Sequence, residues 1–198
     1  MSKQREHRRA KKAEKTKKKR SKAQGSRGSR RVVGMSADAI RRASRWPVWE
    51  CWISQNWRDV DGPVHACFSR QHDDGRVAAS FFEVDLLTRG VVEARGKAGV
   101  EPVQVHQELA RRSTEDAPMM SVDPALVVKL VSTAADYGRK QGHEQPSNLA
   151  HASGLFGDIR GSRCREDIPV GGPDAVPVTA PSGEGWFASV KRSLGFGS

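Results

Sequence analysis

A hairpin pattern runs through Val64-His-Ala-Cys-Phe-Ser-Arg-Gln-His-Asp-Asp-Gly-Arg-Val-Ala-Ala-Ser-Phe-Phe-Glu-Val-Asp-Leu-Leu87. Over residues 64 to 70, apolar side chains alternate with polar or small ones, which is the two-residue period of a half-buried strand. Residues 76 to 87 form a second run, with apolar side chains on both faces. Asp73-Asp74-Gly75 between the runs is a strong turn signal, because Gly adopts the positive φ that tight hairpins need. The stretch therefore predicts two antiparallel strands.

The segments on either side of the hairpin complete the predicted fold. Aromatic and β-branched residues predict a further strand from about 48 to 54, which makes a three-stranded meander. Caps, prolines and helical periodicity predict helices at residues 37 to 44, 101 to 112, 124 to 141, 147 to 155 and 182 to 194. Residues 168 to 181, with four Pro and two Gly, are expected to be extended. The predicted fold class is α+β: a small antiparallel meander of about three strands packed with C-terminal helices.

The first 31 residues differ from the rest of the chain in composition. They carry fifteen of the 34 Lys and Arg residues but only two acidic ones, and they contain no aromatic residue, Ile, Leu or Val. Such a segment cannot bury enough apolar surface to offset the entropy of ordering. We therefore expect residues 1 to 31 to be a disordered basic arm, and residues 32 to 198 to form one α+β domain whose net charge is −2.

The basic arm predicts a polyanionic partner, foremost nucleic acid, with RNA ahead of DNA. Its cations can replace the counterions of a phosphate backbone, which gives affinity that is independent of base sequence. The arm has no aromatic side chain on which bases could stack. A targeting signal, another acidic partner and a solubilising tail stay open as alternatives. The predicted contacts are Arg5, Arg8, Arg9, Lys11, Lys12, Lys15, Lys17, Lys18, Lys19, Arg20, Lys22, Arg27, Arg30 and Arg31.

Two pairs in the hairpin are the candidates for catalysis. His65 and Cys67 lie two apart on one strand, so their side chains share a face, and a His can act as the base that a Cys nucleophile requires. Glu83 and Asp85 share a strand face in the same way and could bind Mg²⁺ or perform acid–base chemistry. Packing groups and solvent-facing charges explain the same residues without any chemistry. We expect a non-enzymatic protein.

Trp46, Trp49, Trp52 and Trp57 cluster within twelve residues. Trp is favoured at binding hot spots, so Trp49 and Trp52 are candidates for a partner surface, although such a cluster can equally anchor a core. Because they are three apart, a regular strand would place them on opposite faces.

The sequence holds no motif for a metal or a cofactor. It lacks Cys-x-x-Cys, His-Glu-x-x-His and the Gly-rich loops that bind phosphates, so neither a metal nor a cofactor is expected. Cys51, Cys67 and Cys164 are expected to be free thiols in a reducing cytosol. The start of the chain has no apolar core of a signal peptide, and no apolar run approaches the roughly 20 residues that span a bilayer. A cytoplasmic protein without membrane contact is predicted.

The segment Ser80 to Ala94, SFFEVDLLTRGVVEA, resembles a signature of a family of uncharacterised bacterial proteins. Further similar motifs in the same order are Trp49-Glu-Cys-Trp52, Asp74-Gly75, Tyr137-Gly138 with Gly142-His143, Phe156-Gly-Asp-Ile159 and Gly171-Gly-Pro-Asp174. The chain departs from the family pattern at Thr88-Arg89, where Cys-Leu is common, and at Val92-Glu93, in place of Lys-Asp. The resemblance covers roughly residues 46 to 175. It implies a compact α+β domain without an established activity, and it assigns no catalytic residue.

Three function classes follow from the sequence. The leading prediction is a non-enzymatic protein that associates with RNA or DNA through its basic arm. The second is a protein-interaction module that uses the Trp-rich strand, and the third is an enzyme of unknown class centred on the hairpin. Oligomeric state, sequence specificity and any substrate stay open.

Overall fold

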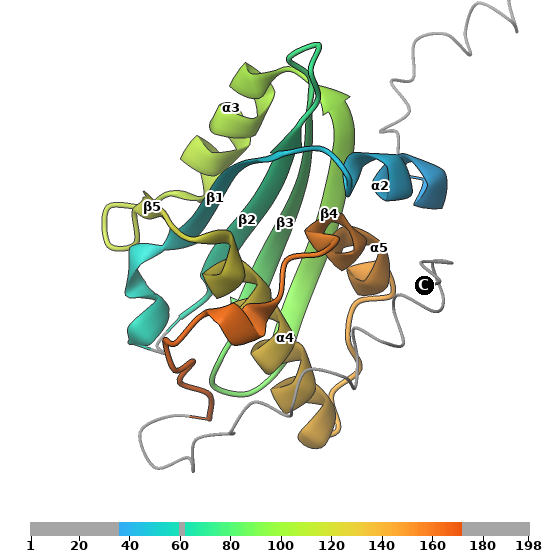
Figure 1. Ribbon diagram of the computed structural model, residues 1–198. Coiled ribbons are helices and arrows are strands. Elements are labelled where there is room, and N and C mark those ends of the chain that lie inside the picture. The colour runs from blue at the N-terminus through green and yellow to red at the C-terminus, as the bar shows by residue number, and fades with distance from the viewer. Residues whose placement is uncertain (1–35, 60–61, 172–198) are drawn as a thin grey trace, which may run out of the picture. The chain divides into compact units, whose positions relative to one another are not determined.

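The computed structural model describes residues 36–59 and 62–171. Its centre is an antiparallel sheet with the strand order β4-β3-β2-β1-β5 (Figure 1). The strands are β1 (Val48–Ser54), β2 (Val64–Gln71), β3 (Val77–Asp85), β4 (Gly90–Val100) and β5 (Met119–Ser121). The α+β class and the predicted meander β1-β2-β3 are confirmed.

The expectation of about three strands was too low, because the sheet has five. β4 escaped prediction because its sequence, GVVEARGKAGV, contains three Gly and three charged residues and lacks a clean two-residue alternation. β5 has only three residues, which is too short for any periodicity to show. Both strands are held in place by pairing with a neighbour, β4 with β3 and β5 with β1.

Four α-helices and three 3₁₀ turns complete the described residues. The elements are α2 (Ala37–Ala43), η1 (Gln55–Arg58), α3 (Pro102–Arg112), α4 (Pro124–Lys140), α5 (Leu149–Ser153), η2 (Gly154–Phe156) and η3 (Gly161–Arg163). Side-chain caps fix two of the helix starts, where Ser36 accepts a hydrogen bond from the amide of Ala39 and Asp123 accepts one from Ala125. These helices confirm the four helices that were predicted between residues 37 and 155. The predicted helix at 182 to 194 and most of the predicted extended segment at 168 to 181 lie outside the described residues.

The helices cover the two faces of the sheet unequally (Figure 1). On one face α2, α4 and α5 enclose the main core, which includes Phe68, Phe82, Val84, Leu130, Val131 and Phe156. On the other face α3 packs Val105 and Leu109 against Cys67, Val77, Ala79 and Phe81. Because β3 is covered on both sides, it reads as a continuous apolar run rather than an alternating one. Within the described part of the chain, no helix combines the length and the apolar character needed to cross a bilayer.

Candidate functional site

The hairpin residues singled out above lie on the face of the sheet that α3 partly covers. The strand register places His65 opposite Glu83 on β3, and Glu83 opposite Glu93 on β4. All three side chains are half-buried. Arg112, the last residue of α3, contacts two members of this row. Its guanidinium Nη1 lies 3.5 Å from His65 Nδ1, and its Nη2 lies 3.6 Å from Glu93 Oε2. The result is a mixed row of charges at the open edge of the α3 interface.

Arg112 ties the end of α3 to the sheet. Its side chain is only 10% exposed, lies 3.2 Å from Glu108 and stacks over the ring of Phe81 at 5.5 Å. Lys97 on β4 approaches the same Glu108 at 3.5 Å. Burial by itself raises the pKa of Glu108, but the two cations outweigh it and lower that pKa. These side chains are committed to one another, which is the arrangement of a structural ion-pair network.

Cys67 lies on the same face as His65, as its spacing predicted, but α3 covers it. The thiol is fully buried among Phe81, Val105 and Leu109, and burial raises its pKa well above the usual value. A buried neutral thiol is a poor nucleophile. This geometry favours the packing role for Cys67. Cys51 and Cys164 are also free, and burial raises the pKa of Cys51 to about 12.

Asp85 has a backbone role at the end of β3. Its carboxylate accepts hydrogen bonds from the amides of Leu87 and Thr88, both at 2.9 Å, and from the Thr88 hydroxyl at 2.5 Å. Burial alone raises the pKa of Asp85, but these hydrogen bonds together lower it. The carboxylate thus closes the turn into β4 instead of pairing with Glu83. Across residues 36–59 and 62–171, no group of three or more His, Cys, Asp and Glu side chains is placed to hold a metal ion.

Trp49 and Trp52 lie on the same face of the sheet, contrary to the expectation from their spacing. Between Val48 and Cys51 the β1–β2 register shifts by one residue, so β1 contains a bulge and the alternation of side chains is reset. Both indoles pack partly buried against the α3 cluster. Trp52 Nε1 donates to Glu50 Oε2 at 3.1 Å, and the same oxygen lies 2.9 Å from His106 Nε2.

A further group, which the sequence patterns did not single out, surrounds a hollow of about 190 Å³. It is lined by Trp46, His72, Asp74, Arg76 and Gly99, which come from the connection between α2 and β1, the β2–β3 turn and the end of β4. Trp46 and His72 meet edge to face, with their ring centroids 4.8 Å apart. Trp46 belonged to the Trp cluster recognised in the sequence, but nothing local indicated that it would meet His72.

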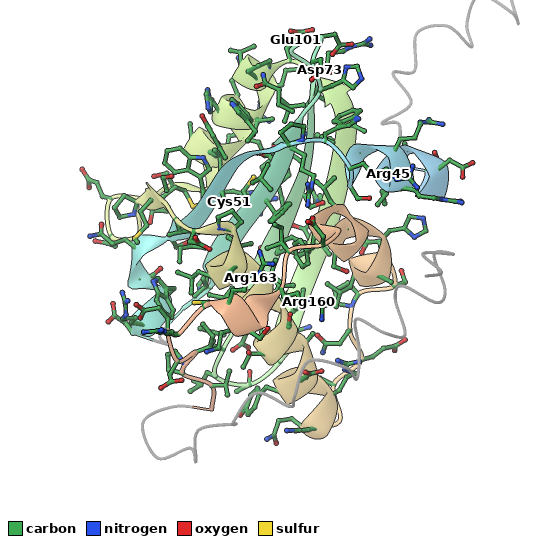
Figure 2. All side chains as sticks on the ribbon, in the orientation of Figure 1. Arg45, Cys51, Asp73, Glu101, Arg160 and Arg163 are labelled. Atoms are coloured by element: carbon green, nitrogen blue, oxygen red, sulfur yellow. The ribbon has the colours of Figure 1, made fainter. Side chains whose placement is uncertain are left out.

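The cations of the predicted arm lie outside the described residues. The basic character continues into the first described helix, where Arg41 and Arg42 in α2 and Arg45 just after it are exposed. Arg41 pairs with Asp38 at 2.8 Å, whereas Arg42 and Arg45 form no ion pair with any residue of 36–59 or 62–171. Figure 2 shows Arg45 at the C-terminal end of α2. This helix is therefore the described surface that continues the arm in both sequence and charge.

The ionisation of His65 should make stability depend on pH. Burial, and then Arg112, lower the pKa of His65 below 6.5, although Glu83 and Glu93 act in the opposite sense. Just below pH 6.5 the unfolded chain thus binds more protons than the folded one, so the free energy of unfolding falls as the pH falls. We expect His65→Gln to lose less stability than the parent between about pH 7.5 and pH 5.5. Urea unfolding at both values, with the exposed His143→Gln as control, measures the difference; equal losses in all three proteins would contradict it.

No protein-family model, curated protein or solved structure matches the chain. The similarity to uncharacterised bacterial proteins over residues 46 to 175 therefore stays a prediction. What the structure defines is an α+β protein with a five-stranded antiparallel sheet, α3 on one face and three helices on the other. Its function has to be argued from its own residues.

Proposed function

We propose that the protein associates with nucleic acid through the phosphate backbone, using the cations of residues 1 to 31. The observation that carries the proposal is the distribution of charge: fifteen basic and two acidic residues in the arm, against a net charge of −2 over the rest of the chain. A surplus of cations confined to one segment favours a linear polyanion over a compact acidic ligand.

The described residues support this function over an enzymatic one. Of the four hairpin candidates, Cys67 is buried, Asp85 closes a turn, and His65 borders the ion-pair network of Arg112. The exposed arginines of α2 and its C-terminal flank follow the arm directly and extend its positive charge onto the domain. A domain whose role is to carry a basic arm needs no catalytic cleft.

Binding measured over a salt series tests the proposal. For the full chain on duplex DNA we expect log K to fall with log salt concentration at a slope steeper than about −4, because several phosphates are neutralised. A chain starting at Val32 should not bind, and its thermal unfolding should show that its domain is still folded. The full-length variant Lys17→Gln, Lys18→Gln, Lys19→Gln should have a slope shallower by about 2 to 3, at 0.9 per lost phosphate contact. The same measurement with duplex RNA shows which of the two nucleic acids the protein binds more tightly.

A matched control changes the net charge by the same amount on the domain. Arg95, Arg111 and Arg139 are exposed and each already faces a carboxylate, on Glu93, Glu108 and Asp136 respectively. Replacing these three by Gln should change the salt slope by less than about 1. Equal binding by the full chain and by the chain starting at Val32 would show that the arm is not the binding element. An absence of binding by the full chain would end the proposal.

A further inference from the structure

The hollow lined by Trp46 and His72 has the composition of a site for a planar ring. Its lining combines two aromatic rings with a carboxylate and a guanidinium, on Asp74 and Arg76, and Gly99 contributes no side chain. Arg76 donates to Asp74 through Nε at 2.9 Å and through Nη2 at 2.7 Å. This ion pair holds both groups at the rim; the exposed fraction is 58% for the Arg76 side chain and 38% for Asp74.

The size of the hollow limits its occupant. At about 190 Å³ it is smaller than the roughly 300–1,000 Å³ typical of sites for drug-sized ligands and cofactors. A single ring system fits such a volume, whereas a base pair does not. The planes of the Trp46 and His72 rings lie at 65° to each other. A ligand ring that stacks on one of these two side chains can therefore meet the edge of the second.

The position of the hollow links it to the arm. Trp46 is the second residue after Ser44, the C-cap of α2, and it directly follows the exposed Arg45. Only five peptide bonds separate Arg31, the last cation of the arm, from Ser36, the first described residue, and they span at most about 18 Å. Along the chain, the arm therefore leads directly into α2. Figure 2 shows Arg45 at the C-terminal end of α2 and Asp73 at the tip of the hairpin whose neighbouring residues line the hollow.

We propose that this hollow binds one unpaired base of a single-stranded nucleic acid whose phosphates are held by the arm and by Arg42 and Arg45. The base stacks on Trp46 or His72, and the exposed guanidinium of Arg76 offers a donor to its edge, while Asp74, which accepts from Arg76 and contacts His72, holds the two side chains in place. Base–aromatic stacking does not depend on base identity, since every base has a π face. The inference rests on the proposed function, and it adds a preference for single strands that the arm, without aromatic residues, cannot supply.

The test uses the full chain and three probes: a short single-stranded RNA, the same RNA with abasic sites, and its duplex. We expect the parent to bind the single strand more tightly than the abasic probe. His72→Ala and Trp46→Leu should each weaken binding of the single strand by about five- to tenfold, the effect of losing one stacking contact, and should leave binding of the abasic probe unchanged. Trp49→Leu, which alters a partly buried Trp on the other sheet face, is the matched control and should bind as the parent does.

Two features keep the experiment decisive. Trp46 also packs against the main core, so Trp46→Leu is accepted only if its thermal unfolding is close to that of the parent. His72 is 43% exposed, and its truncation tests the hollow without that risk. If His72→Ala binds the single strand as the parent does, or if the parent binds the abasic probe equally well, the hollow is not a base site. Should the arm variant Lys17→Gln, Lys18→Gln, Lys19→Gln still lose affinity in that case, the arm function stands and this inference alone fails.

Discussion

Replacing Arg70 by Met should lower the free energy of unfolding by about 3–5 kcal/mol, because it removes three hydrogen bonds that a buried charged group donates to backbone carbonyls. The Arg70 side chain is 4% exposed and lies on the core face of β2. Its guanidinium donates to three backbone carbonyls: Leu155 at 2.8 Å, Phe156 at 2.7 Å and Trp46 at 2.5 Å. One charged side chain thus joins the central sheet to η2 and to the chain leaving α2.

The carbonyl groups decide the size of the effect. Burial lowers the pKa of Arg70, and Asp158, whose carboxylate lies 3.2 Å away, opposes that change. Asp158 is 86% exposed and regains water when Arg70 is lost, so the ion pair itself contributes little. The carbonyl of Leu155 lies in the core and cannot do so, and a buried acceptor without a donor costs about 1–3 kcal/mol. The carbonyl of Phe156 loses a charged donor but keeps the hydrogen bond from the amide of Ile159, at 3.1 Å.

Urea unfolding of the parent and of Arg70→Met measures this cost. Arg76→Met is the matched control, because Arg76 also pairs with an Asp but is exposed; it should lower the free energy of unfolding far less than Arg70→Met does. Arg70→Lys should fall between the two, since an ammonium can reach only part of this set of acceptors. A loss below about 1 kcal/mol for Arg70→Met would show that the guanidinium is not what holds η2 to the sheet.

Gly90→Ala should lower the free energy of unfolding by about 2–4 kcal/mol, because β4 and α4 touch backbone to backbone at this residue. Gly90 has φ +80°, and a Cβ there would overlap the carbonyl oxygen of Ala134 and lie 2.9 Å from the Cα of Gly138. The converse holds on the helix, where a Cβ on Gly138 would overlap the carbonyl of Arg89. An added methyl group must therefore separate strand and helix, which costs about 1–3 kcal/mol on top of the backbone strain.

The chain provides a control that separates strain from overlap. Gly75 has nearly the same φ, +86°, but a Cβ there would meet nothing within 4 Å. Gly75→Ala should thus show the strain alone, about 1 kcal/mol. Thermal and urea unfolding of both variants give the comparison. If Gly90→Ala costs no more than Gly75→Ala, the close approach of α4 to β4 is not a tight constraint.

Most of the local structure was predictable because its determinants are neighbours in sequence. The strand from 48 to 54 was predicted with its observed bounds, and the helices beginning at Ala37, Pro102 and Pro124 were recognised by caps, prolines and apolar periodicity. β4 was missed because its glycines and charges hide the strand pattern, and its place in the sheet depends on β3 and on the contact of Gly90 with α4. Local propensity does not contain that information.

The candidate sites show the same division. The spacing correctly predicted that His65 and Cys67 lie on one face of the sheet. Only the position of α3 shows that His65 is half-buried and Cys67 is fully buried. For Trp49 and Trp52 the spacing argument was wrong, because a single bulge in β1 resets the alternation of side chains. Arg70 carried a usable signal, a charged residue in register with Val64, Ala66 and Phe68 on an apolar face. Two of the carbonyls that it bonds, on Leu155 and Phe156, lie more than eighty residues away in the sequence, and no local pattern pointed to them.

By itself the sequence determined the α+β class, the hairpin, the main helices and the confinement of the positive charge to the first 31 residues. Each of these depends on composition or on short-range periodicity, which the chain carries whatever its tertiary structure. Tertiary structure alone decided the five-stranded order, the acceptors of Arg70, the burial of Cys67 and the meeting of Trp46 with His72. These features join residues that are distant in sequence, and only the packing of helices on the sheet brings such residues together.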